Sequence, residues 1–92
     1  MIENTYILYY TKDACSDYKK VAKSDYKHKV DELLELLKIN PFQNPPPFKK
    51  LIGLYDGAIS RRINLKHRLF YQVDTEAKTI KILRMCSHYG DN

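Results

Sequence analysis

Side chains with phosphate-binding chemistry are concentrated in one short stretch of this 92-residue sequence. Residues 49–68 carry six cations and one anion, a net charge of +5 that equals the formal net charge of the whole chain. The cations are Lys49, Lys50, Arg61, Arg62, Lys66 and Arg68. Concentrated positive charge in a small domain favours a polyanionic partner, which is either nucleic acid or an acidic protein segment. Composition alone leaves both partners open.

A histidine near the end of the sequence, followed by a tyrosine, is the candidate for proton transfer. His88 and Tyr89 follow an apolar run, and an imidazole can donate a proton to a leaving group near neutral pH. On spacing alone, however, a surface or hydrogen-bonded His88 is the simpler interpretation. His67 is a candidate phosphate contact in a loop, and His28 is interpreted as a helix-surface residue.

Other common reaction classes lack their sequence signatures. There is no Gly-rich phosphate loop, HExxH, CxxC or GxSxG motif, so we expect neither a metal nor a cofactor. Cys15 and Cys86 have no ligand spacing and are expected to be free thiols. No apolar run approaches the roughly 18 residues of a membrane span, and the N-terminal residues lack a basic leader. We therefore expect a cytoplasmic protein without a membrane segment.

The basic stretch is predicted to form a β-hairpin with cations at its mouth. Residues 58–63 and 68–73 are rich in branched and aromatic side chains and flank a four-residue loop. After a polar turn, residues 79–86 alternate well enough to form a further strand.

The first half of the chain is predicted to be a strand followed by a helical hairpin. Residues 6–10 suit a strand that is covered on at least one face. Thr11 can cap a first helix that runs through Lys23, and Ser24 or Asp25 can cap a second. An apolar stripe on the second helix consists of Tyr26, Val30, Leu33, Leu34 and Leu37.

Proline residues separate the helical hairpin from the strands. Asn40-Pro41 is expected to end the second helix, and residues 45–47 are expected to follow an extended, polyproline-like path. Residues 49–57 are expected to form a loop or irregular edge. The fold prediction is therefore a single α+β domain over residues 1–92, with two helices packed on a mainly antiparallel, four-stranded sheet in the order β-α-α-β-β-β.

Three short motifs occur in order after the proline-rich crossing: SRRI at residues 60–63, HRLxY at residues 67–71 and HY at residues 88–89. Together they resemble the YoeB/Txe toxins of the RelE superfamily, over most of the chain. The resemblance implies a RelE-like fold and the toxin half of a type II toxin–antitoxin pair, which cleaves mRNA in the ribosomal A site without a metal. The implied partners are a YefM/Phd-like antitoxin with an acidic segment, the ribosome and mRNA, and a homodimer is compatible with it.

The resemblance also suggests roles for individual residues. His88 resembles the general acid, Arg68 the phosphate clamp, and Tyr89 a residue that orients or stacks on a nucleotide. Arg61 and Arg62 match the family's paired arginines, which implies contacts to mRNA or ribosomal RNA. The remaining cationic and imidazole groups of the basic stretch are expected to add RNA contacts, namely Lys50, Lys66 and His67.

Lys49 departs from the family pattern. Twelve residues before Arg61, the family usually carries the glutamate that acts as general base, and this chain has a lysine there. A lysine could still accept the proton if neighbouring cations favour its neutral form. The alternative is a weakened or non-catalytic module that binds an acidic antitoxin segment or RNA.

Overall fold

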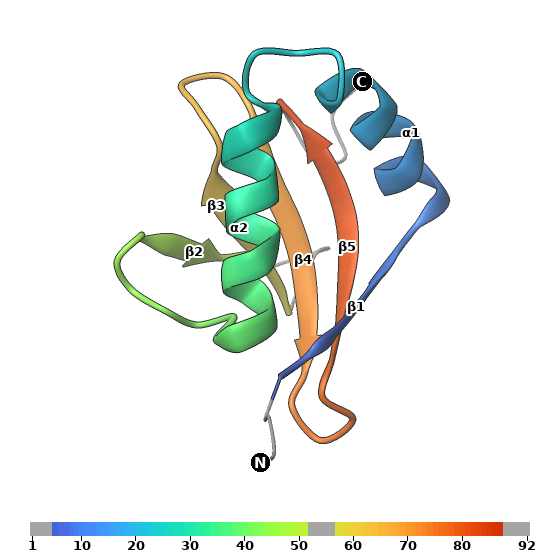
Figure 1. Ribbon diagram of the computed structural model, residues 1–92. Coiled ribbons are helices and arrows are strands. Elements are labelled where there is room, and N and C mark those ends of the chain that lie inside the picture. Colours follow the sequence, from blue (N-terminus) through green and yellow to red (C-terminus); the bar gives the residue numbers. More distant parts are fainter. Residues whose placement is uncertain (1–4, 52–56, 88–92) are drawn as a thin grey trace.

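Two helices pack against a five-stranded mixed sheet in the computed structural model (Figure 1). The structure describes residues 5–51 and 57–87. The elements in chain order are β1 (Ile7–Tyr10), α1 (Lys12–Val21), α2 (Lys27–Ile39), β2 (Phe48–Lys50), β3 (Ala58–Arg62), β4 (Arg68–Asp74) and β5 (Thr79–Cys86). The α+β class and the helical hairpin agree with the prediction from sequence.

The sheet has one strand more than predicted and is mixed. Its strand order is β1-β5-β4-β3-β2, in which β1 runs parallel to β5 and the other neighbours are antiparallel. The additional strand, β2, covers Phe48 and two residues that the sequence analysis assigned to a loop or irregular edge. Two of the three are lysines that remain exposed, so the segment lacks the apolar alternation that identifies a strand. Pairing with β3 along one edge is enough to order it.

Asp17 binds the part of the β5 edge that β1 does not cover. The register of β1 stops at Ile82. Beyond that point the buried Asp17 carboxylate accepts hydrogen bonds from the backbone N–H of Met85 at 2.9 Å and from Arg84 Nε and Nη2 at 2.8 and 3.0 Å. This ion pair raises the pKa of the Arg84 guanidinium. It also fixes α1 against the C-terminal end of β5, since a buried carboxylate is stable only when it is paired.

Thr11 caps α1 as predicted, whereas the cap of α2 differs from the prediction. The Thr11 hydroxyl accepts a hydrogen bond from the Ala14 N–H at 3.0 Å. The residue before α2 is Tyr26, which makes no side-chain cap, so the prediction of Ser24 or Asp25 in this position was wrong. Ser24 instead closes the connection between the helices, because its hydroxyl donates to the Val21 carbonyl and accepts from the Tyr26 N–H.

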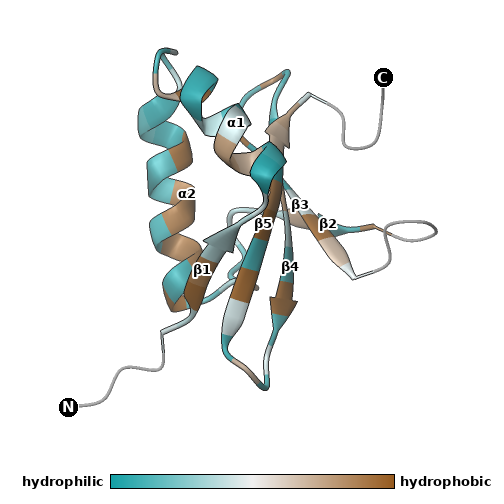
Figure 2. Cartoon of the chain, turned by 90° about the vertical axis from the view of Figure 1, so that its right-hand side faces the viewer, coloured by the Kyte–Doolittle hydropathy of each residue, from teal (hydrophilic) through white to brown (hydrophobic). Residues whose placement is uncertain are grey.

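The hydrophobic core lies between the helices and one face of the sheet. The hydrophobic residues of α2, brown in Figure 2, lie on the side of the helix nearest the strands. Val30, Leu33, Leu34 and Leu37 are buried as the predicted stripe required, and Tyr26 is partly buried beside them. Ala14 and Val21 of α1 and residues from β3, β4 and β5 complete the cluster.

Two further sequence expectations concern the cysteines and membrane spans. Cys15 is an exposed free thiol, as predicted, and Cys86 is partly buried. Neither described helix has the length and apolar character needed to cross a membrane.

Candidate active site

The β3–β4 hairpin divides the cationic residues between the two faces of the sheet. Residues that pair directly across antiparallel strands share a face, and successive residues along a strand alternate between faces. Arg61 pairs with the buried Leu69 and therefore lies on the face that the helices cover. In the part of the chain that the structure describes, the opposite side of the sheet carries no helix (Figure 2). We call this side the open face, and its residues from β2, β3 and β4 include Lys49, Ser60, Arg62, Arg68 and Phe70.

Arg68 is the partly buried cation of the open face. Its Nε donates a hydrogen bond to the Ser60 hydroxyl, and its cross-strand partner is Arg62. Burial, and secondarily the positive charge of Arg62, lower the pKa of Arg68. Within residues 5–51 and 57–87, no carboxylate pairs with Arg68 and no group accepts a hydrogen bond from its terminal nitrogens. The outer end of this guanidinium is therefore free to bind an anion.

Arg61, in contrast, is completely buried. Its Nε donates to the Tyr71 hydroxyl at 2.9 Å, and its terminal nitrogens donate to the carbonyls of Pro41, Gln43 and Pro46. The RNA contact predicted for Arg61 is contradicted by this burial, because each of the three guanidinium nitrogens already donates to the protein itself. Arg61 is a structural residue, and only its exposed neighbour Arg62 fits a surface role.

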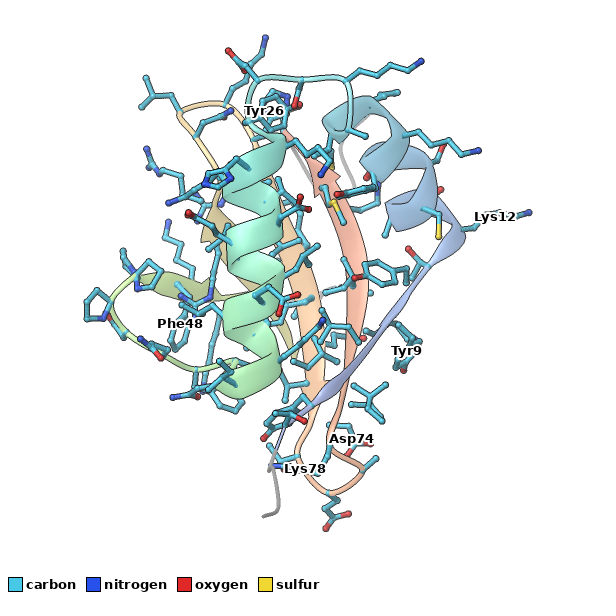
Figure 3. All side chains as sticks on the ribbon, in the orientation of Figure 1. Tyr9, Lys12, Tyr26, Phe48, Asp74 and Lys78 are labelled. Atoms are coloured by element: carbon cyan, nitrogen blue, oxygen red, sulfur yellow. The ribbon has the colours of Figure 1, made fainter. Side chains whose placement is uncertain are left out.

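The Arg61 network also determines the path of the segment that leads into β2. Tyr71 donates from its hydroxyl to the Pro41 carbonyl at 2.8 Å, and burial raises the pKa of this tyrosine despite the nearby Arg61. The Arg61 guanidinium carbon lies 4.9 Å from the centre of the Phe48 ring, which Figure 3 labels beside α2. The chain bends at Pro45 and Pro46 around these contacts, so the predicted extended path was wrong.

Lys49 and Lys50 are both exposed on β2 but face opposite sides of the sheet. Lys49 pairs with Ser60 and so lies on the open face, next to the residue that holds Arg68. Lys50 pairs with Ile59 and lies on the helix side. Of the two lysines, only Lys49 is positioned to act together with Arg68.

The β3–β4 loop holds the other predicted RNA contacts. Lys66 is exposed. The ring of His67 stacks on Tyr26 with the centroids 4.6 Å apart and the planes inclined by 23°. Tyr26 lies at the start of α2 (Figure 3), so this stack ties the loop to the helix. The Asn64 side-chain oxygen accepts the backbone N–H groups of Lys66 and His67, which fixes the loop further.

His88 and Tyr89 lie outside the described residues. The last described strand leads toward them, and its final residue, Cys86, pairs directly with Arg68. Among the described residues, no group of three or more histidine, cysteine or acidic side chains is arranged so that it could hold a metal ion.

A separate cavity of about 450 Å³ lies between α1, α2 and β1, away from the open face. The Asp31 carboxylate that lines it is already paired: the Tyr18 hydroxyl and the Lys27 ammonium each donate to it at 2.6 Å. These bonds, that of Lys27 first, lower the pKa of Asp31. None of the residues predicted for the site lines this cavity.

Ser60 is the site residue that the sequence analysis did not single out. It belongs to the SRRI motif, but a serine in a strand carries no signal of its own. The available signal was its position two residues before Arg62, which places both side chains on the same face of a strand.

The topology is that of a RelE-superfamily toxin domain. The fold is shared with Escherichia coli YafQ, which is 20% identical and superposes with a TM-score of 0.74 over 90% of this chain and 93% of that one. At the level of sequence, a family described as the YoeB-like toxin of bacterial type II toxin-antitoxin systems matches residues 10–89. The chain belongs to this family.

Solved structures of YoeB proteins agree with this assignment. The chain resembles a YoeB/ParE toxin from Agrobacterium tumefaciens with 27% identity, a TM-score of 0.81 and coverage of 90% of this chain and 99% of that one. It resembles a Staphylococcus aureus YoeB dimer with 33% identity, a TM-score of 0.78 and coverage of 92% and 99%. YoeB in a YoeB-YefM complex from the same organism is 32% identical, with a TM-score of 0.77 and coverage of 91% and 98%. A comparison with curated proteins gave no match.

Proposed function

We propose that this toxin is a ribosome-dependent, metal-independent endoribonuclease that cleaves mRNA in the ribosomal A site. The observation that carries the proposal is the pair Arg62 and Arg68 on the open face, with which no described carboxylate forms an ion pair, in a chain of the YoeB-like toxin family. Two adjacent cations, one of them partly buried without a carboxylate in the described part of the chain, favour occupation by a phosphate group. Ribosomal mRNA supplies that group, and this site of action would place the protein in the cytoplasm.

The proposed reaction needs no redox step or cofactor. The ribose 2′-oxygen attacks the adjacent phosphorus and loses its proton to a base, and the bond to the 5′-oxygen breaks as that oxygen receives a proton. The products are a 2′,3′-cyclic phosphate and a 5′-hydroxyl. Arg68 would stabilise the charge of the phosphorane, and His88, two residues after the strand partner of Arg68, would protonate the 5′-oxygen. Tyr89 would orient or stack on a nucleotide, and Arg62, Lys66 and His67 would contact RNA.

Cleavage in a translating system tests this proposal directly. Purified protein is added to a cell-free translation reaction, and primer extension maps the mRNA ends. We expect cuts at defined codon positions that require active ribosomes. If translating ribosomes yield no such cuts, the proposal is wrong. RNA or antitoxin binding without cuts would support the alternative of a non-catalytic module, which the lysine at position 49 favours.

Two substitutions of Lys49 test whether this residue acts as the general base or only contacts phosphate. Only a neutral amine accepts a proton, so a lysine base predicts cleavage that rises with pH and is strongly impaired in Lys49→Met. Lys49→Glu would then supply a carboxylate that is already ionised at neutral pH, and cleavage should be retained or increased. We expect this outcome in single-turnover reactions at several pH values.

The opposite ranking of the two Lys49 variants would reject the base. If Lys49 only contacts phosphate, Lys49→Glu adds an anion where a cation stood and should cleave more slowly than Lys49→Met at every pH. Lys50→Glu serves as the matched control, because the same charge change then falls on the helix side of the sheet.

The proposed partner is an antitoxin whose acidic segment neutralises the open face when the toxin is idle. The S. aureus relative is known in a YoeB-YefM complex, which supports a partner of this kind.

We predict that Arg62→Glu weakens the complex by roughly tenfold or more and reduces its dependence on salt, because one exposed cation is replaced by an anion. Lys12→Glu, on α1, makes the same charge change elsewhere and should leave both unchanged. Isothermal titration at two salt concentrations measures both properties, and equal values for the two variants would place the antitoxin on another surface. Self-association, suggested by the S. aureus YoeB dimer, is measured in the same preparations.

A further inference from the structure

Two arginines on the neighbouring strands β4 and β5, Arg68 and Arg84, are oriented by different chemistry. Arg84 is paired with Asp17, whose two carboxylate oxygens accept from Nε and Nη2. Arg68 donates from Nε to a serine hydroxyl instead. Both contacts hold a guanidinium in one direction, but only the carboxylate cancels its charge. Arg84 is thereby a structural cation, whereas Arg68 keeps its full positive charge.

The Ser60 hydroxyl is itself held rigidly. Ser60 is 2% exposed and lies in the middle of β3, with Lys49 opposite on β2 and Phe70 opposite on β4. A residue paired on both sides of a strand has little backbone freedom, and serine has a single side-chain torsion to fix. A hydrogen bond from such a residue restrains Arg68 more than a contact from an exposed loop would.

The hydrogen bond between Ser60 and Arg68 also determines which side of the guanidinium can bind a phosphate. A guanidinium presents either its Nε side or its terminal nitrogens to a phosphate. Because Ser60 occupies Nε, the two terminal nitrogens remain for the ligand, and among the described residues none accepts from them. This is the arrangement that a bidentate phosphate contact requires.

We infer that Ser60 is the positioning residue for Arg68, and that a neutral hydroxyl serves here because it orients the guanidinium without neutralising it. The inference rests on the proposed function for its kinetic consequence, but the contact itself is independent of it. Ser60 touches no reacting atom and acts only through Arg68.

Kinetics of Ser60 variants test the consequence. Ser60→Ala should lower kcat by about tenfold to a hundredfold with little change in KM, because a charge-assisted hydrogen bond that aligns a transition-state contact is lost. Ser60→Thr keeps the hydroxyl and should recover most of the rate. Ser60→Asp should hold Arg68 but cancel its charge, and should be at least as impaired as Ser60→Ala. Ser16→Ala, an exposed serine on α1, is the control and should match the parent.

A double-mutant cycle separates positioning from general structural damage. Lysine has no Nε donor of the guanidinium type, so in an Arg68→Lys background the substitution Ser60→Ala should have no further effect on cleavage. If Ser60→Ala lowers the rate by the same factor in both backgrounds, Ser60 acts through something other than Arg68 and the inference is overturned.

A spectroscopic measurement distinguishes failure of this inference from failure of the proposed function. The Nε–H signal of Arg68, identified by its loss in Arg68→Lys, should exchange slowly with solvent in the parent and in Ser60→Thr, and about tenfold faster in Ser60→Ala. An unchanged exchange rate in a folded Ser60→Ala protein overturns the inference even if the parent cleaves mRNA. If the parent cleaves nothing but the exchange rate changes as expected, the proposed function is wrong and Ser60 still positions Arg68.

Discussion

Arg61→Ala is expected to destabilise the protein by about 3 to 5 kcal/mol in the free energy of unfolding. The substitution removes the donors that satisfy three backbone carbonyls of residues 41–46 and the Tyr71 hydroxyl. Each buried acceptor that is left without a partner costs about 1 to 3 kcal/mol. A domain of 92 residues has a free energy of unfolding of roughly 5 to 14 kcal/mol, so the expected loss is a large fraction of the total.

Arg62→Ala is the matched control for this prediction, because it removes the same side chain from the next position in β3. Arg62 is exposed, and its replacement should change the stability by no more than about 0.5 kcal/mol. Tyr71→Phe keeps the buried ring and removes only the hydroxyl, for an intermediate loss of about 1 to 3 kcal/mol. Urea unfolding followed by circular dichroism measures all three variants. Equal midpoints for Arg61→Ala and Arg62→Ala would show that the buried network adds little.

The second large effect is expected at His88. If this histidine protonates the 5′-oxygen, His88→Gln should lower the rate of the chemical step by about 10² to 10⁴, which is the usual contribution of a positioned acid. Glutamine is similar in size and polarity but cannot donate a proton in this way. Single-turnover cleavage on saturating ribosomes measures the step separately from binding.

Controls at the neighbouring position separate acid catalysis from stacking. Tyr89→Ala should lose about 1 to 3 kcal/mol if only a base stack is removed. The unfolding transition of His88→Gln should match that of the parent, since a group that acts in the reaction need not contribute to stability. Parental cleavage by His88→Gln would leave this histidine without a chemical role.

Sequence reasoning succeeded where local signals determine the structure. The strand Thr79–Cys86 has the bounds that were predicted from its alternation and the polar turn before it. The Thr11 cap and the β3–β4 hairpin were also predictable, because a hydroxyl before a helix and a polar loop between branched residues act over a few residues.

Sequence reasoning failed where a feature depends on contacts between segments that are far apart in the sequence. The burial of Arg61 depends on three carbonyls from residues 41–46 and on Tyr71, none of which is adjacent to it in sequence. A run of cations suggested a solvated surface, yet strict alternation along a strand already required Arg61 and Arg62 to face opposite sides. The alternation rule by itself could therefore have separated the two arginines. The strand β2 and the parallel pairing of β1 had no comparable local signal.

The pairing of β1 with β5 has a kinetic consequence. It joins Ile7 to Thr79, 72 positions further along the chain. Closing such a long loop costs roughly 2 kcal/mol more entropy than closing a short hairpin, so contacts of this kind form late in folding. The ribosome makes β5 after every other described element, and both β1 and Asp17 depend on it. We therefore expect a nascent chain to remain incompletely folded until β5 has emerged from the ribosome.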